Sequence, residues 1–357
     1  MDLKLSPPIS NDPFTQDEFR LCNFTGAREE TKTYKYIPNP LTGKCLVTVP
    51  DTQIDELDTL IKSMSACPPY GLHNPLYRKE RYALYGQIFA RAADTLATAE
   101  VYDYFTRLIN TVMPKGIEEC KGEVTVVRDF LYNLAGDGVR NLAQGVITPG
   151  NRTGQEACSY PYPYGPVAII APFNFPLEIP ALQLCGALAM GNKPLLKPDS
   201  RVAVVAEAFV RLLYCCGIPD DDMCLLHAGG KTTEHLMKMK INGQPLIRMI
   251  QFTGSTKIAK RLLRLTEGRV KIEDSGFNWK ILGPNFFTEN VEPVARQCDK
   301  DAYGASGQKC SAQSLLITHK NWVKAGLWNR LVKLADERKV EDLSIGPILS
   351  WSDQRIA

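Results

Sequence analysis

Residues 165–197 read GPVAIIAPFNFPLEIPALQLCGALAMGNKPLLK, and this stretch decides the fold class. Two short apolar runs, at 166–171 and 194–197, are typical of buried strands. Between them, residues 179–190 form an apolar run that is long enough for a helix. A strand, a helix and a second strand in this order predict a βαβ unit with two parallel strands.

The same alternation continues towards the C-terminus. The pattern predicts helices over 202–216 and 258–265 and strands over 246–253 and 269–273. Ser200 is a candidate N-cap for the first of these helices, and Gly217 and Gly268 are expected to end the two helices. We therefore expect an α/β fold built on a Rossmann-like parallel sheet.

The flanking segments are mostly helical. Apolar residues at helical spacing predict helices over 54–64, 81–98, 101–112 and 118–134, the first of them capped by Asp51. Residues 1–50 show weak periodicity and predict a loose segment with one hairpin around 41–49. A single long helix is expected over about 322–339.

Composition favours a globular protein that binds a small molecule. The 357 residues suggest about two domains, and the net charge of +3 without charged blocks indicates neither nucleic acid nor a membrane surface as partner. Eleven irregularly spaced cysteines fit a reducing compartment. The start of the chain shows no signal or transit peptide, and the four scattered histidines predict no metal site.

The segment 304–311, GASGQKCS, contains the candidate nucleophile Cys310. Small residues allow a close backbone approach to a ligand, and a reactive thiol needs positive charge or backbone dipoles to favour its thiolate. We expect Lys309 to supply that charge. The ordinary alternative, a small buried cysteine, is preferred for the other ten cysteines.

Three further motifs have candidate chemistry. The amide of Asn174, within 172–176, could hold an oxyanion, although a turn-forming Asn would look the same. Gly254 and Ser255 lie between a predicted strand and a helix, where a phosphate or a simple turn would fit. Glu273 ends a predicted strand and is a candidate general base or a solvated loop acid.

In this order, the motifs resemble those of the aldehyde dehydrogenase superfamily. Its pattern is a Pro-Phe/Trp-Asn-Phe-Pro loop, a Lys-Pro strand end, a Gly-Ser-Thr turn, a base glutamate and a Gly-Gln-x-Cys nucleophile. The chain has these at 172–176, 197–198, 254–256, 273 and 307–310. The resemblance implies an NAD-binding domain over 1–281, with a bridging hairpin near 145–163, and an incomplete α/β catalytic domain over 282–357 that carries Cys310.

The resemblance also implies a role for each site residue. Cys310 would attack the aldehyde, Asn174 and the Cys310 backbone N–H would hold the oxyanion, and Glu273 would activate water. Phe175 and Ser311 would contact the substrate. Ser200 stands where many members have a ribose-binding acid, so the choice between NAD and NADP stays open. The NAD-binding residues would be Ala171, Pro172, Phe173, Lys197, Ser200, Gly229, Gly254 and Ser255.

Longer segments, among them 174–180, 191–197 and 310–314, are similar to plant-type delta-1-pyrroline-5-carboxylate dehydrogenases. That group oxidises glutamate γ-semialdehyde to glutamate in proline breakdown. The resemblance therefore implies this substrate, a homo-oligomer and the mitochondrial matrix, with the cytoplasm as the alternative location.

The family continues well beyond the point that corresponds to Ala357, with a Glu-x-Phe-Gly-Pro motif and an oligomerisation strand. We therefore expect a C-terminally truncated member. Two alternatives remain: a catalytically weak or inactive homologue that acts as a binding partner, and a cysteine acyltransferase or hydrolase that uses no nucleotide.

Overall fold

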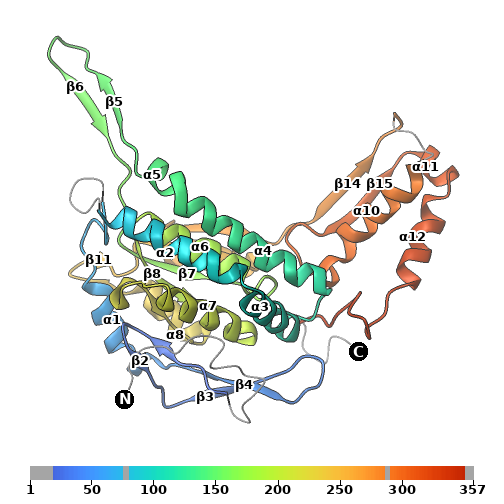
Figure 1. The fold of residues 1–357 in the computed structure, drawn as a ribbon, viewed down its shortest axis with the longest axis horizontal. Helices are drawn as coiled ribbons and strands as arrows, with labels where there is room; N and C mark the ends of the chain where they lie inside the picture. Colours follow the sequence, from blue (N-terminus) through green and yellow to red (C-terminus); the bar gives the residue numbers. More distant parts are fainter. Residues whose placement is uncertain (1–18, 75–79, 286–289, 350–357) are drawn as a thin grey trace.

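The computed structural model describes residues 19–74, 80–285 and 290–349, and a seven-stranded sheet forms its centre (Figure 1). Strands β1 (Asn23–Phe24) and β2 (Arg28–Glu29) extend one edge in the antiparallel sense. The other five strands are parallel: β13 (Val270–Asp274), β12 (Met249–Gly254), β7 (Pro166–Ile170), β8 (Lys193–Lys197) and β9 (Cys224–Leu225). The predicted α/β fold with a Rossmann-like parallel sheet is confirmed.

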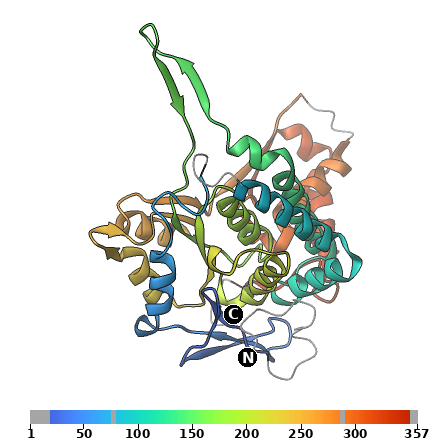
Figure 2. The ribbon, with the colours of Figure 1, turned by 60° about the vertical axis from the view of Figure 1, so that its left-hand side comes forward.

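Helices cover both faces of this sheet (Figures 1 and 2). Alternate side chains of β7 point to opposite faces, so Ile169 joins one core while Ala168 and Ile170 join the other. The first core lies under α2 (Glu80–Ala97), α3 (Ala99–Val112), α4 (Ile117–Asn133), α6 (Glu178–Ala189) and α7 (Ala203–Cys215). The second lies under α1 (Asp58–Ser65), α8 (Gly230–Lys238) and α9 (Thr256–Leu265).

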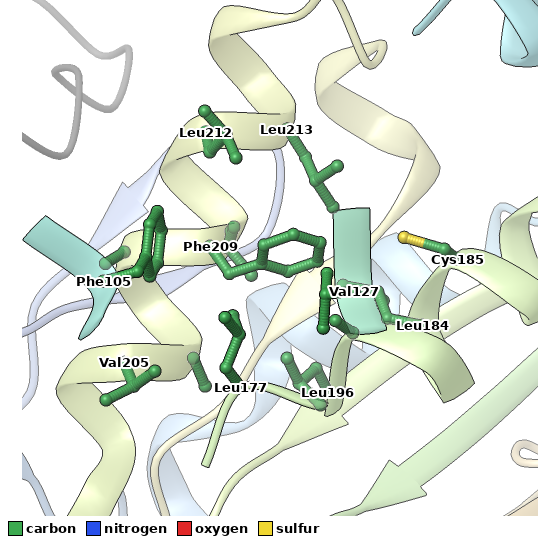
Figure 3. Packing of buried hydrophobic residues seen from close by; sticks show 14 of the residues in the cluster. Phe105, Val127, Leu177, Leu184, Cys185, Leu196, Val205, Phe209, Leu212 and Leu213 are labelled. Carbon is green, nitrogen blue, oxygen red and sulfur yellow. The ribbon is translucent and has the colours of Figure 1, made fainter. Parts of the chain in front are cut away.

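The larger core is centred on large apolar side chains of the helical layer. Phe209 of α7 lies among Val127, Leu177 and Leu184, as Figure 3 shows, and all four are buried. The sheet contributes Leu196 to the same cluster. This packing fixes α4 and the start of α6 against the sheet.

The strand order changes direction at β7. Strands β8 and β9 follow on one side of β7, whereas β12 and β13 lie on the other side. In open α/β sheets, the loops at the carboxyl ends of the strands separate at such a point and leave a crevice for a ligand. The fold therefore predicts a site near the ends of β7 and β12.

Several small elements surround the sheet. A hairpin of β5 (Val146–Pro149) and β6 (Glu156–Ser159) projects from the body with every residue exposed (Figure 1). Two more hairpins pair β3 (Tyr34–Pro38) with β4 (Cys45–Pro50) and β10 (Lys240–Ile241) with β11 (Gln244–Pro245). Short helical segments are η2 (Ile54–Glu56), η3 (Leu134–Gly138), α5 (Val139–Leu142), η4 (Ser200–Val202) and η5 (Asp220–Asp222).

The C-terminal part has its own small sheet and core. Strand β14 (Asn278–Leu282) pairs in parallel with β15 (Gln313–Thr318) and not with the large sheet. Trp322 and Leu327 are central to the core beneath it. The accompanying helices are α10 (Val291–Tyr303), η7 (Gly304–Gly307), α11 (Lys320–Lys324) and α12 (Leu327–Asp336). The expected domain boundary at 281 falls inside β14, so we propose that it lies between β13 and β14.

Two expected helix caps are wrong. Asp51 does not cap the helix that follows, because its carboxylate binds the Lys35 ammonium at 2.8 Å. The N–H of Gln53 at the start of η2 is instead accepted by Glu56, at 2.8 Å. Ser200 is also not the cap; the neighbouring Asp199 accepts the Arg201 N–H at 3.0 Å and begins η4.

Three expected elements differ in extent. Residues 19–50 are more ordered than their weak periodicity suggested, because β1 pairs with β9 and the hairpin spans β3 and β4. Strand β12 begins at Met249, after the expected start at 246. The long helix expected over 322–339 is two helices, because Gly326 adopts the left-handed conformation at φ 91° between them.

Among the described residues, no helix combines the length and apolarity that a bilayer crossing requires. The first 18 residues, where no leader peptide was expected, and Pro75 lie outside the described residues.

Candidate active site

A cavity of about 1100 Å³ opens at the carboxyl ends of β7, β8, β12 and β13. The loop before β15 closes one of its sides. Of the residues predicted from sequence, those that line it are Ala171, Pro172, Phe173, Asn174, Lys197, Gly254, Ser255, Glu273 and Cys310. Motifs more than 130 residues apart in the chain, such as Asn174 and Gln308, are in direct contact there.

Four predicted residues are not part of the lining. Ser200 and Gly229 are each next to residues that are, namely Asp199, Arg201 and Gly230. Ser311 directly follows Cys310 and is exposed. The Phe175 ring lies under the Lys115 ammonium, whose nitrogen is 4.5 Å from the ring centroid.

Cys310 follows a tight backbone turn. Ala305, Ser306 and Gly307 all have left-handed φ values, of 50°, 56° and 74°. Two of these are not glycines, and such conformations cost about 1–3 kcal/mol each unless surrounding structure holds them. Strain of this kind clusters at functional sites, and here it precedes an exposed cysteine.

The protonation of Cys310 differs from the expectation. Partial burial raises the pKa of the Cys310 thiol above its ordinary value, and the nearby Glu273 carboxylate raises it further. The backbone N–H groups of Ser311 and Cys310 act in the opposite direction. The expectation that Lys309 leaves this pKa lowered is therefore wrong; the Lys309 ammonium instead lies 5.9 Å from the Phe175 ring centroid.

The Asn174 amide lies against the nucleophile loop. Its nitrogen donates to the Gln308 carbonyl at 2.9 Å. An amide NH₂ group has two hydrogens, so one donor remains for a ligand beside Cys310. Asn174 can therefore both brace the loop and hold a developing oxyanion.

A buried ion pair supports the Asn174 loop from behind, and the sequence analysis did not identify it. The Lys115 ammonium binds Glu123 at 2.7 Å and reaches the Asn174 carbonyl at 3.4 Å. Glu123 also accepts the N–H groups of Leu177 and Glu178 at 2.7 and 2.9 Å. One signal could have found it, because Glu123 falls on the otherwise apolar face of α4.

Gln308 connects the loop to the last described segment. Its side-chain amide donates to the Pro347 carbonyl at 3.0 Å and accepts the Leu349 N–H at 2.8 Å. Ser306 adds a bond to the Gly346 carbonyl at 3.0 Å. Ile348 thereby reaches the cavity lining, a contact that no sequence pattern indicated.

The β12–α9 turn has the features of an anion site. Ser255 is the N-cap of α9, whose first N–H groups have no partner within the helix. A Cβ on Gly254 would come within 2.8 Å of the Phe252 ring, so only glycine leaves this part of the cavity open. The turn can therefore accept a phosphate at close range.

Cationic groups line the cavity near the end of β8. Burial lowers the pKa of the Lys197 amine. Arg201, which sequence reasoning missed, binds Asp199 at 2.7 Å and lies over the Phe173 ring at 4.4 Å from its centroid. Within the described part of the chain, His, Cys, Asp and Glu side chains form no group of three or more that could hold a metal.

Comparison with known proteins agrees with this architecture. Residues 27–355 match the family model described as the aldehyde dehydrogenase family. The chain is 49% identical over 316 residues to delta-1-pyrroline-5-carboxylate dehydrogenase 12A1, mitochondrial, of Arabidopsis thaliana. This alignment covers 88% of the chain and 56% of that protein. A probable aldehyde dehydrogenase of Linum usitatissimum is 46% identical, with 90% and 57% covered.

Among solved structures, a putative methylmalonate-semialdehyde dehydrogenase from Sinorhizobium meliloti 1021, complexed with NAD, shares the fold. It aligns with a TM-score of 0.78 at 23% identity, covering 93% of this chain and 64% of the other. The chain thus spans little more than half the length of the curated relatives that it matches.

Proposed function

Because the chain belongs to the aldehyde dehydrogenase family, we propose that it oxidises an aldehyde to a carboxylate through a thioester on Cys310, with NAD as hydride acceptor. One observation carries this proposal. Cys310, Glu273 and Asn174 line one cavity, where Glu273 raises the pKa of the Cys310 thiol and the Asn174 amide donates to the carbonyl of Gln308, two residues before Cys310.

The proposed steps assign one task to each residue. The Cys310 thiol releases its proton to solvent as the sulfur attacks the carbonyl carbon, and the free Asn174 N–H stabilises the oxygen. The adduct loses a hydride and becomes a thioester. Glu273 then takes a proton from water, which attacks the thioester, releases the carboxylic acid and restores the thiol.

The residues present fit a dinucleotide. Bound NAD would accept the hydride. The N-terminus of α9 offers N–H groups to a pyrophosphate, and Gly254 keeps that approach open. Lys197, Ala171, Pro172 and Phe173 line the same cavity and would hold the adenosine end. Asp199 and Arg201 stand beside Ser200, so cofactor preference should be measured with both NAD and NADP.

The proposed substrate is glutamate γ-semialdehyde. Support comes from the similarity to the Arabidopsis protein and from the matching segments around Asn174 and Cys310. Phe175 and Ser311 are proposed to contact this substrate, although they lie beside the cavity lining. We also propose a homo-oligomer and a mitochondrial location, which the name of that relative supports, in the matrix as the family resemblance implies, with the cytoplasm as alternative.

The test is NADH formation by the purified chain with a panel of aldehydes. We expect glutamate γ-semialdehyde to give the highest kcat/KM and the Cys310→Ala variant to give none. Equal rates from the variant and the unchanged chain would exclude Cys310 as nucleophile.

A second candidate, a catalytically weak homologue that acts as a binding partner, is favoured by one observation. Trp279 and Ile281 of β14 and Leu315 and Ile317 of β15 form an exposed apolar face. This candidate predicts NAD binding without turnover, which the same assay and a thermal shift with NAD would detect. A third candidate, acyl transfer without a nucleotide, predicts no thermal shift.

A further inference from the structure

Asn278 lies at the start of β14 and contacts the loop that carries Cys310. It is reached from Glu273, at the end of β13, by a short connection. Its side-chain nitrogen donates to the Cys310 carbonyl at 2.6 Å and to the Ala312 carbonyl at 2.8 Å. One side chain therefore bridges the turn that presents the nucleophile.

The backbone next to Asn278 lies close to the same turn. A Cβ on Gly276 would come within 3.3 Å of the Asn278 Oδ1 and 3.9 Å of the Cys310 carbonyl oxygen. The pairing of β14 with β15 is irregular between Asn278 and Trp279. At this end of the ladder, the Asn278 amide supplies bonds to carbonyls that precede β15.

The Cys310 carbonyl and the Ser311 N–H belong to one peptide unit. A peptide unit is planar and trans, so its C=O and N–H point in opposite directions. Asn278 holds the oxygen on one side of that plane, and on the other side the Ser311 N–H acts to lower the pKa of the Cys310 thiol. Rotation of the plane would break both contacts together.

We propose that Asn278 is a positioning residue for Cys310: it fixes the peptide plane whose N–H is directed at the sulfur. The effect of Asn278 passes through this peptide and not through contact with the substrate. The inference rests on the proposed role of Cys310 as nucleophile. Its consequence, however, is a property of the thiol that can be measured without any substrate.

The experiment measures the rate at which iodoacetamide labels Cys310 as a function of pH in N278A. Loss of the Ser311 N–H contact favours the thiol over the thiolate, so the apparent pKa should rise. Labelling at a fixed pH below that pKa should fall by about tenfold for each unit of that rise. N278D should show at least as large an effect, because it removes the same donor and adds a negative charge.

Two controls separate positioning from unfolding. The first control is N321A, which also removes an amide from the C-terminal part. The Asn321 amide donates to the Pro284 carbonyl at 3.2 Å, away from Cys310, so Cys310 labelling should be unchanged. Cys298 is buried in α10, so iodoacetamide can label it only if this part of the chain unfolds. We expect Cys298 to stay protected in N278A.

The outcomes are distinct. Slower Cys310 labelling with a shifted pH profile and a protected Cys298 supports the proposal. An unchanged rate and profile in N278A overturns it, as does joint acceleration at Cys310 and Cys298, which would make Asn278 only a structural residue. If the unchanged chain forms no NADH but N278A still slows labelling, only the proposed function fails.

Discussion

The Glu273 carboxylate influences the protonation of the Cys310 thiol, and the direction of this effect can be measured. The Glu273 carboxylate raises the pKa of the Cys310 thiol, because a neighbouring negative charge disfavours the thiolate. Glu273→Gln keeps the shape and removes the charge, so this pKa should fall. We expect faster iodoacetamide labelling of Cys310 near neutral pH, with the pH profile moved to lower pH. Slower or unchanged labelling would show that Glu273 does not control the thiol.

The buried Lys115–Glu123 pair should contribute strongly to stability. Both side chains are almost fully buried, so Lys115→Met leaves a carboxylate without its cation. Such a change costs about 3–5 kcal/mol of unfolding free energy, which urea denaturation measures. The matched control is Lys121→Met on α4, whose exposed pair with Glu118 should cost below about 1 kcal/mol. Equal losses in the two variants would contradict the account.

At the scale of single residues, the sequence identified the residues of the site but not the orientation of their side chains. Cys310, Asn174 and Glu273 were predicted from their local motifs, and the structure brings them into one cavity. The orientation of Lys309 towards Phe175 was not predictable, because a lysine side chain can turn to either side of its backbone. Asn278 has no motif of its own; its role depends on a contact across two strands.

Among the elements, the β12–α9 turn gives the sharpest test of the cofactor site. Gly254→Ala would push its Cβ against the Phe252 ring, and the ring or the turn must then shift where both residues line the cavity. We expect NAD affinity to fall on the order of tenfold, or about 1.4 kcal/mol, in calorimetry. Gly283→Ala is the control, since nothing lies within 4 Å of its added carbon. An NAD affinity equal to that of the control would exclude this turn from the cofactor site.

Element prediction succeeded where periodicity was long and failed where glycine or pairing intervened. Helices α2, α3 and α4 agree with the expected ranges to within two residues, because each buries a continuous apolar stripe. The α11–α12 break required knowing that Gly326 adopts a left-handed conformation. Strand β1 is only two residues long and is stabilised by β9, about 200 residues away in the chain.

At the scale of the whole molecule, the exposed face of β14 and β15 should drive association. Trp279 is 65% exposed and Ile281 56%, side by side with Leu315 and Ile317. Contiguous exposed apolar surface marks an interaction site or an aggregation risk. We expect sedimentation to show concentration-dependent association that weakens in the double variant Trp279→Ser, Ile281→Thr. Tyr36→Ser, a lone exposed aromatic on β3, should change nothing. A monomer at every concentration would contradict this prediction.

For the whole molecule, the sequence predicted the parallel sheet, and the sheet's strand order then locates the crevice. The alternation of strands and helices after residue 165 predicted the βαβ units, and the strand order then places the cavity at β7 and β12. The sequence did not predict that β14 and β15 form a separate two-stranded sheet, because short strands do not reveal which sheet they join.

The most direct test of the central claim is peptide mass mapping of Cys310 during turnover. The Glu273→Gln chain, mixed with NAD and glutamate γ-semialdehyde, should accumulate the thioester because its hydrolysis is slowed. We predict an acyl adduct on the Cys310 peptide that requires NAD and appears with one NADH per adduct. NADH formation without that adduct, or an adduct confined to another cysteine, would contradict the account.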